Sequence, residues 1–128
     1  MRISLTSIYV DDQDKALRFY TEVLGFVKKA DFSKGPFRWL TVSAAEGGTQ
    51  LQLAKNDNPA AKAFQAALFE QGQPAVMFDT DDVDADCARI TAQGGDLVMP
   101  PTDVTGSRIA KVKDGCGNLV QITQLKGW

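Results

Sequence analysis

The chain contains the same motif twice, and the second copy begins 70 residues after the first. The first copy joins the acidic segment Val10–Asp14 to Leu24–Phe26 through an amphipathic stretch. The second copy joins Thr80–Asp84 to Gly94–Asp96 through a stretch of the same length. An internal repeat of this size predicts two copies of one structural unit, and this constrains the fold more than composition does.

The first copy predicts a β-α-β-β-β order. Ile3–Val10 is rich in β-forming residues and predicts a strand. Asp12 or Asp14 can cap the helix that follows. The apolar residues of that helix recur at helical spacing, at Ala16, Leu17, Tyr20, Val23 and Leu24. Three further strands are expected, at Phe26–Phe32, Phe37–Ser43 and Thr49–Ala54.

The second copy repeats this order after a connector, Asn56–Gln73, which is expected to hold a short helix. A strand, a helix and a short strand ended by Pro100-Pro101 are expected at Ala75–Thr80, Val83–Gln93 and Leu97–Met99. A hairpin of Arg108–Lys113 and Leu119–Gln124 should close around Asp114–Asn118, where two glycines allow a tight loop.

The predicted fold class is therefore α+β. Residues 1–128 form one domain, with module one at 1–55, the connector at 56–73 and module two at 74–128. The two β-α-β-β-β modules are expected to form an eight-stranded, cup-shaped mixed sheet with helices outside. The connector is long enough for a cup within one chain or for swapped cups in a dimer.

Composition excludes several classes of function. The net charge is −2 and the lysines are scattered, so nucleic acid and anionic membranes are not expected partners. No apolar run approaches the roughly 20 residues of a membrane span, and residues 1–10 do not resemble a signal peptide, which favours a cytoplasmic location. Cys87 is expected in the core and Cys116 in an exposed loop, and free thiols suit a reducing cytosol.

The motifs resemble the vicinal oxygen chelate superfamily, which includes glyoxalase I, bleomycin and fosfomycin resistance proteins and extradiol dioxygenases. The segments that carry the resemblance are Val10–Asp12, Phe19-Tyr20, Val23–Phe26, Asp81–Ala85, Gly94-Gly95, Asp114 and Gly117-Asn118. The resemblance implies a homodimer and paired modules around a cup. One departure is Gly115, which occupies a position where the family usually has proline.

The resemblance also implies where metal-using members place their ligands, on the first, fourth, fifth and eighth strands. Those positions are Leu5, Gln52, Ala75 and Gln121 in this chain. Two of them are apolar and two are neutral amides, whereas divalent cations are held by imidazole, thiolate or carboxylate groups. We therefore expect no metal and no cofactor, and neither glyoxalase I nor ring-cleaving dioxygenase activity.

Strand alternation predicts which residues share the cup face. The candidate ligand-binding residues are Leu5, Ser7, Tyr9, Trp39, Gln50, Gln52, Ala75, Met77, Lys111 and Gln121. Lys111 faces the cup if the last hairpin loop has five residues, and Ala110 does so if it has four. Each polar or aromatic member can equally be a packed core residue or part of a dimer contact.

Two functions follow from this set. The preferred one is a metal-free binding protein that holds, and thereby sequesters, a small apolar or aromatic drug or metabolite. The alternative is a metal-independent lyase or isomerase acting on a secondary metabolite, with Tyr9, Lys111 or Asp79 as acid or base. A third possibility is an interaction subunit whose cup is filled by its own side chains.

Overall fold

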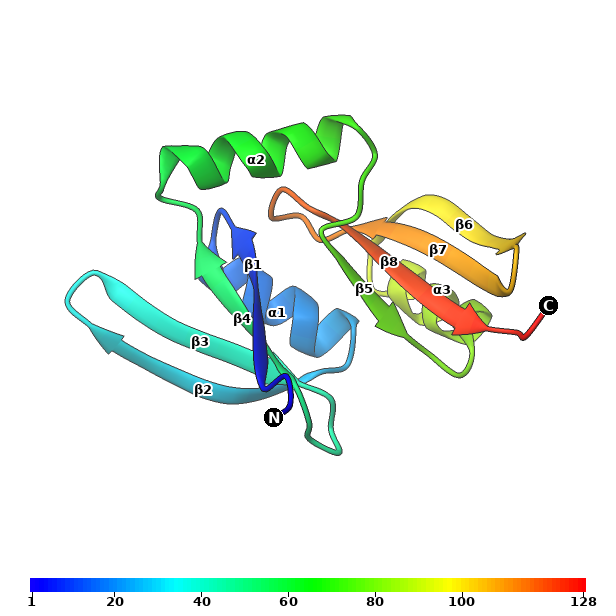
Figure 1. Cartoon of the computed structure of the whole chain (residues 1–128), viewed down its shortest axis with the longest axis horizontal. Coiled ribbons are helices and arrows are strands. Elements are labelled where there is room, and N and C mark those ends of the chain that lie inside the picture. The colour runs from blue at the N-terminus through cyan, green and yellow to red at the C-terminus, as the bar shows by residue number, and fades with distance from the viewer. The chain divides into compact units, whose positions relative to one another are not determined.

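The eight strands lie in two four-stranded sheets, with strand orders β1-β4-β3-β2 and β5-β8-β7-β6 (Figure 1). The structure is a computed structural model that describes residues 1–128. The chain divides into two compact units, Met1–Phe64 and Gln65–Trp128. The boundary lies within helix α2, Pro59–Glu70. None of the helices has both the length and the apolar character that crossing a membrane requires.

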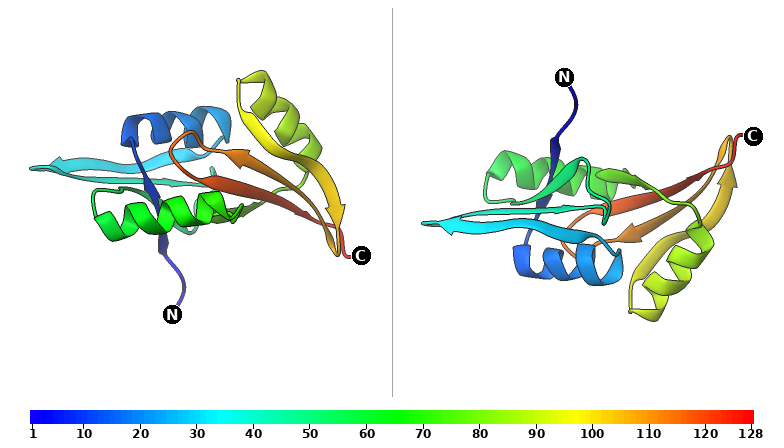
Figure 2. Two further views of the ribbon diagram at one scale, coloured as in Figure 1. Left: turned by 90° about the horizontal axis from the view of Figure 1, so that it is seen from above. Right: turned by 90° about the horizontal axis from the view of Figure 1, so that it is seen from below.

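The first unit has the expected β-α-β-β-β order. Its strands are β1 (Leu5–Val10), β2 (Val27–Lys34), β3 (Phe37–Ser43) and β4 (Gln50–Lys55). Its helical segment consists of α1 (Gln13–Arg18) and a π-helical turn, η1 (Phe19–Val23). β1 runs parallel to β4, and the other pairs are antiparallel. Figure 2 shows α1 along one face of this sheet, where it contacts β4.

The second unit repeats this arrangement. Its strands are β5 (Val76–Asp79), β6 (Asp96–Val104), β7 (Ser107–Lys113) and β8 (Leu119–Leu125). Helix α3 (Val83–Ala92) packs on one face, against β6, β7 and β8. β5 runs parallel to β8, as β1 does to β4. The α+β class and the two β-α-β-β-β modules are therefore confirmed, and the eight strands are divided equally between the modules.

The acidic motif of each copy begins a helix, as its composition predicts. The side chain of Asp12 accepts a hydrogen bond from the backbone N–H of Lys15 at 3.0 Å. The side chain of Asp82 accepts one from Ala85 at 3.0 Å. Each aspartate satisfies one of the N–H groups that a helix start leaves without a helical partner. Asp12, and not Asp14, is thus the cap in the first copy.

The side chains between each helix and its sheet form the core. In the first unit they include Ile8, Val10, Ala16, Tyr20, Leu40, Val42, Leu51 and Leu53. In the second unit they include Val83, Cys87, Ile90, Ala110, Val112, Val120 and Ile122. Cys87 is therefore a core residue, as its helical position predicts. In β1, β4 and β7 the buried residues alternate with less buried ones, so each sheet has one helix-covered face and one more exposed face, here called the open face. β3 differs, because Thr41 and Ser43 are buried as well as Leu40 and Val42.

The prediction that Pro100-Pro101 ends a strand was wrong. The prolines do not end a strand, because β6 continues through them from Asp96 to Val104. They fall where the pairing with β7 is irregular, between Met99 and Thr102. β6 is also an edge strand, so the absent N–H groups of proline cost fewer ladder hydrogen bonds.

The expectation that Cys116 is exposed was also wrong, because its side chain is fully buried. The amide of Gln65, on α2, donates a hydrogen bond to the carbonyl oxygen of Cys116 at 2.9 Å. The buried carboxylate of Asp114 accepts hydrogen bonds from the backbone N–H groups of Cys116 and Asn118. The loop between β7 and β8 is therefore held from inside by polar groups.

Candidate functional site

The open face of the first sheet brings together the six site residues predicted in the first module. The parallel register of β1 and β4 places Leu5 opposite Gln50 and Ser7 opposite Gln52. Side chains two residues apart on one strand share a face, which adds Tyr9 to this set. Thr41 pairs with Gln52, so Trp39 joins the same face from β3.

Two hydroxyl groups fix the orientation of the amides on this face. Ser7 donates a hydrogen bond to Oε1 of Gln52 at 2.8 Å, and Thr41 donates one to Oε1 of Gln50 at 2.8 Å. In each amide the oxygen is therefore engaged, and the NH₂ group remains as a donor. Both amides are half-buried, where a hydrogen bond to a bound molecule competes less with water.

Two further aromatic residues lie on this face, Phe32 and Phe37, and neither was among the predicted site residues. Phe32 is directly opposite Trp39 in the antiparallel pair of β2 and β3. The ring of Phe37 lies 6.5 Å from that of Trp39, centroid to centroid, with the planes tilted by 40°. We call Phe32, Phe37 and Trp39 the aromatic trio. The i, i+2 spacing of Phe37 and Trp39 was the available signal.

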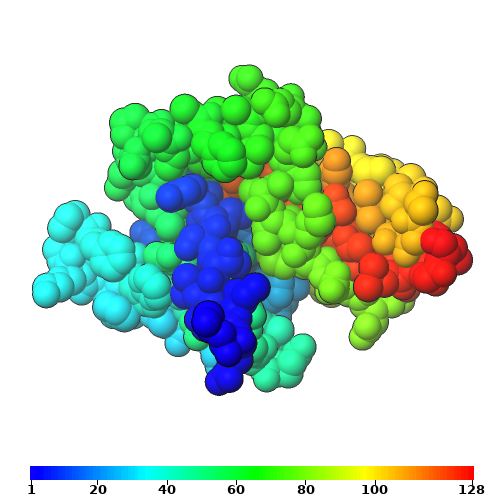
Figure 3. All heavy atoms as spheres, in the orientation of Figure 1, coloured from blue at the N-terminus to red at the C-terminus, as the bar shows by residue number.

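The aromatic trio is accessible to solvent. Phe32 is 60% exposed and Phe37 is 52% exposed, while Trp39 is half-buried. The side chains of β1 and of the β2–β3 hairpin are visible in Figure 3, in blue and cyan. Neighbouring rings that expose their faces offer a stacking surface for a planar molecule, worth about 0.5–1.5 kcal/mol per pair beyond area burial.

The second sheet carries the other four predicted residues on its own open face. Met77 lies opposite Gln121 on β5 and β8, and Lys111 lies opposite Gln121 on β7. The loop from Asp114 to Asn118 has five residues, so Lys111 shares this face and Ala110 is buried on the other one. Ala75 precedes β5 and donates its backbone N–H to the carbonyl oxygen of Leu119 at 2.9 Å.

The polar groups on this second face already have partners. Nε2 of Gln121 donates to Sδ of Met77 at 3.7 Å and to the hydroxyl of Thr123 at 3.2 Å. Nζ of Lys111 donates to the carbonyl oxygen of Gly72 at 3.3 Å. Met77 is nevertheless 63% exposed, so this face combines an open apolar side chain with amide and ammonium groups.

The residues at the family's metal-ligand positions do not fit a divalent cation. Leu5 and Ala75 have no donor atom, and the side-chain oxygen of Gln52 is engaged by Ser7. Gln121 contributes a neutral amide. No group of three or more cysteine, aspartate or glutamate side chains converges to hold a metal ion. A catalytic metal ordinarily needs about three protein ligands, with charge among them for hard cations.

Paired β-α-β-β-β modules with an open face on each sheet define a class of protein that uses this scaffold for many chemistries. The chain belongs to the Glyoxalase/Bleomycin resistance protein/Dioxygenase superfamily, whose family model matches residues 2–122. It is 45% identical over 126 residues to YurT of Bacillus subtilis (strain 168), a protein described as uncharacterized. That match covers 97% of this chain and 99% of YurT.

Two solved structures are similar over nearly the whole chain. UcmS2 superposes with a TM-score of 0.83 at 28% identity, covering 96% of this chain and 97% of UcmS2. TnmS3, described as an antibiotic binding protein from Streptomyces sp. CB03234, superposes with a TM-score of 0.81. Its identity to this chain is 32%, with coverage of 98% of this chain and 97% of TnmS3.

Proposed function

We propose that this protein binds a small, apolar or aromatic molecule, such as a drug or metabolite, and sequesters it without changing it chemically. The observation that carries the proposal is the aromatic trio beside the amides of Gln50 and Gln52. The rings provide the stacking surface, and the two NH₂ groups fix the orientation of a ligand that carries hydrogen-bond acceptors. The similarity to TnmS3 supports binding as the function of this scaffold.

We propose further that binding needs no metal. Metal-dependent members would use the positions that are Leu5, Gln52, Ala75 and Gln121 here, and none of these side chains supplies an anionic or imidazole ligand. The NH₂ groups of Gln50 and Gln52 would take the polar atoms of the ligand instead. Binding should therefore be unaffected by a chelator.

We also propose that the protein is a homodimer that works in the cytoplasm. The exposed apolar side chains on both open faces, among them Phe32 and Met77, favour association. The two free cysteines, Cys87 and Cys116, suit a reducing compartment. Sedimentation velocity at micromolar concentration tests the dimer, and a purely monomeric species would contradict it.

The test of the function is a titration with N-phenyl-1-naphthylamine, a neutral fluorescent aromatic probe, in the presence of EDTA. Trp39→Ala should weaken binding roughly 30-fold, because loss of an aromatic anchor costs about 2 kcal/mol or more. Gln52→Ala should weaken the binding of acceptor-bearing competitors more than that of the probe. Trp128→Ala is the matched control, since Trp128 is an exposed terminal residue outside the sheet.

Aromatic metabolites and antibiotics that displace the probe are then recovered and analysed chromatographically. Unchanged recovery supports sequestration, whereas conversion supports the metal-independent lyase or isomerase. Gln121→Ala tests the open face of the second unit separately. If the probe does not bind, or if Trp39→Ala binds it as the wild type does, the proposal fails.

A further inference from the structure

Arg38 of β3 forms ion pairs with two aspartates on the helix-covered face of the first sheet. The guanidinium of Arg38 forms two parallel hydrogen bonds with the carboxylate of Asp31, both at 2.9 Å. Its remaining nitrogen, Nη1, donates to Asp14, in the first turn of α1, at 2.7 Å. Such a bidentate pair fixes direction as well as distance, because the planar fork matches the carboxylate.

The main chain at this point is held as well. Nε2 of Gln13, the first residue of α1, donates to the carbonyl oxygen of Arg38 at 3.2 Å and to that of Leu53 at 2.9 Å. Side chain and backbone of Arg38 are thus both tied to the start of one helix. We call these contacts of Arg38 with Asp31, Asp14 and Gln13 the Arg38 clamp.

The Arg38 clamp lies on the opposite side of the sheet from the aromatic trio. Arg38 stands between Phe37 and Trp39 in β3, and Asp31 precedes Phe32 in β2. Alternation sends the clamp residues to the helix side and the three rings to the open side. Every ring of the trio is therefore a direct chain neighbour of a clamp residue.

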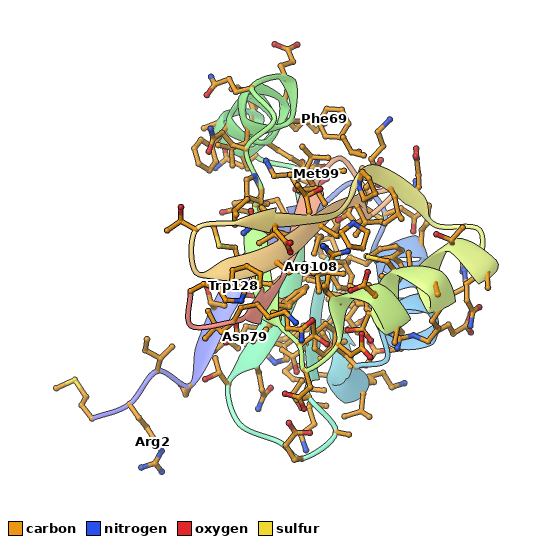
Figure 4. The ribbon with its side chains drawn as sticks, turned by 90° about the vertical axis from the view of Figure 1, so that its right-hand side faces the viewer. Arg2, Phe69, Asp79, Met99, Arg108 and Trp128 are labelled. Atoms are coloured by element: carbon orange, nitrogen blue, oxygen red, sulfur yellow. The ribbon has the colours of Figure 1, made fainter.

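The second unit also contains an arginine paired with two aspartates, but it has no counterpart of the aromatic trio. Arg108, which is labelled in Figure 4, lies 70 residues after Arg38. It pairs bidentately with Asp84 of α3 at 2.9 Å and also with Asp103 of β6 at 2.9 Å. On the open face, its two neighbours in β7 are Ser107 and Ile109. An arginine paired with two aspartates thus exists where no aromatic trio is present, although Val83 replaces the glutamine that contacts the backbone in the first unit, and it provides an internal control.

We propose that Arg38 is a positioning residue of the ligand site: by tying the β2–β3 hairpin to the start of α1, it holds the aromatic trio in one stacking arrangement. The binding consequence rests on the proposed function, while the immobilisation of the rings does not. Without the clamp the hairpin retains its backbone pairing, but its tip is free to twist, and the rings lose their common geometry. Pre-organisation of this kind strengthens binding by lowering the ordering cost.

The experiment uses full-length protein carrying Trp128→Phe, so that Trp39 is the only tryptophan. Arg38→Gln and Arg108→Gln are compared for acrylamide quenching and fluorescence anisotropy of Trp39 without ligand, and then for affinity toward N-phenyl-1-naphthylamine. Arg38→Gln should raise quenching, lower anisotropy and weaken probe binding about ten-fold. Arg108→Gln should leave all three near their starting values.

Circular dichroism and urea unfolding verify that each variant is folded, and Arg38→Lys replaces Arg38→Gln if the latter is not. Lysine keeps the charge but cannot form the fork, so it should move Trp39 in the same direction. Equal quenching in the Arg38 and Arg108 variants overturns the positioning role. If quenching responds to Arg38 but the starting protein does not bind the probe, the positioning of the rings stands and the proposed function fails.

Discussion

Replacing Gly117 with alanine should destabilise the protein far more than replacing its neighbour Gly115. Both glycines lie in the loop between β7 and β8, with φ of +98° and +74°, where a side chain is disfavoured. At Gly117 a Cβ atom would also lie 2.6 Å from Nε2 of Gln65 and 3.1 Å from its Cδ. At Gly115 a Cβ atom would meet nothing within 4 Å.

The expected magnitude follows from these contacts. The left-handed backbone costs roughly 1–2 kcal/mol for either alanine. Gln65 is buried, and its amide donates to Cys116 at 2.9 Å and to Asn118 at 3.2 Å. Displacing it breaks these two buried hydrogen bonds, which costs a further ~1–3 kcal/mol. Gly117→Ala should therefore lower the free energy of unfolding by about 2–5 kcal/mol, and Gly115→Ala by about 1–2 kcal/mol.

Urea unfolding followed by far-ultraviolet circular dichroism at pH 7 and 25 °C measures both values, with the wild type as reference. A second test measures Gly117→Ala and Gly115→Ala in protein that already carries Gln65→Ala. Once the amide is gone, the alanine at 117 should cost no more than the alanine at 115. Equal losses for the two single alanine variants would show that Gln65 does not brace the loop.

Three further predictions concern acid, thiols and packing. The Arg38 guanidinium holds the pKa of Asp31 below its ordinary value of 3.8, so this pair stabilises the folded state above that pH and its contribution is lost as pH falls through the lowered pKa. Asp31→Asn should therefore flatten the loss of stability between pH 5 and pH 2 in urea titrations, and an unchanged slope would contradict the pairing. Burial raises the pKa of the Cys87 thiol and encloses Cys116, so a thiol reagent at pH 8 should label both in urea but neither in minutes under native conditions. Ile90→Ala, at a fully buried position of α3, should lower the free energy of unfolding by about 2–5 kcal/mol, and a loss below about 1 kcal/mol would place Ile90 outside the core.

The repeat made most of the fold predictable. Because the acidic motif recurs at a constant offset, one interpretation of a strand, a capped helix and three further strands applied to both modules. Asp82 caps its helix as predicted, and Asp12 is the cap of the two aspartates that the first motif allowed. Of the two loop lengths considered, the five-residue loop is present and sets the pairing of Lys111 with Gln121. These features depend on short-range chemistry and strand alternation, which a sequence displays directly.

The predictions that were wrong or incomplete concern residues whose local structure depends on distant parts of the chain. Cys116 lies between two glycines and looks exposed, but it is buried in a loop braced by Gln65, 51 residues away. Pro100-Pro101 looks like a strand end, but the edge position and irregular pairing of β6 accommodate it. Phe32 joins the candidate site only through its register opposite Trp39, which no local pattern specifies.

The most direct test of the proposed binding face is to locate a bound aromatic molecule by NMR. Isotope-labelled protein is titrated with N-phenyl-1-naphthylamine while backbone amide, glutamine side-chain and indole signals are followed. We expect the largest shifts at the indole of Trp39, the side-chain NH₂ groups of Gln50 and Gln52, and the backbone of β3. Residues on the helix side, such as Arg38 and Asp14, should shift less. Saturable binding that leaves the Trp39 and Gln52 signals in place and moves signals elsewhere would contradict the proposed binding face.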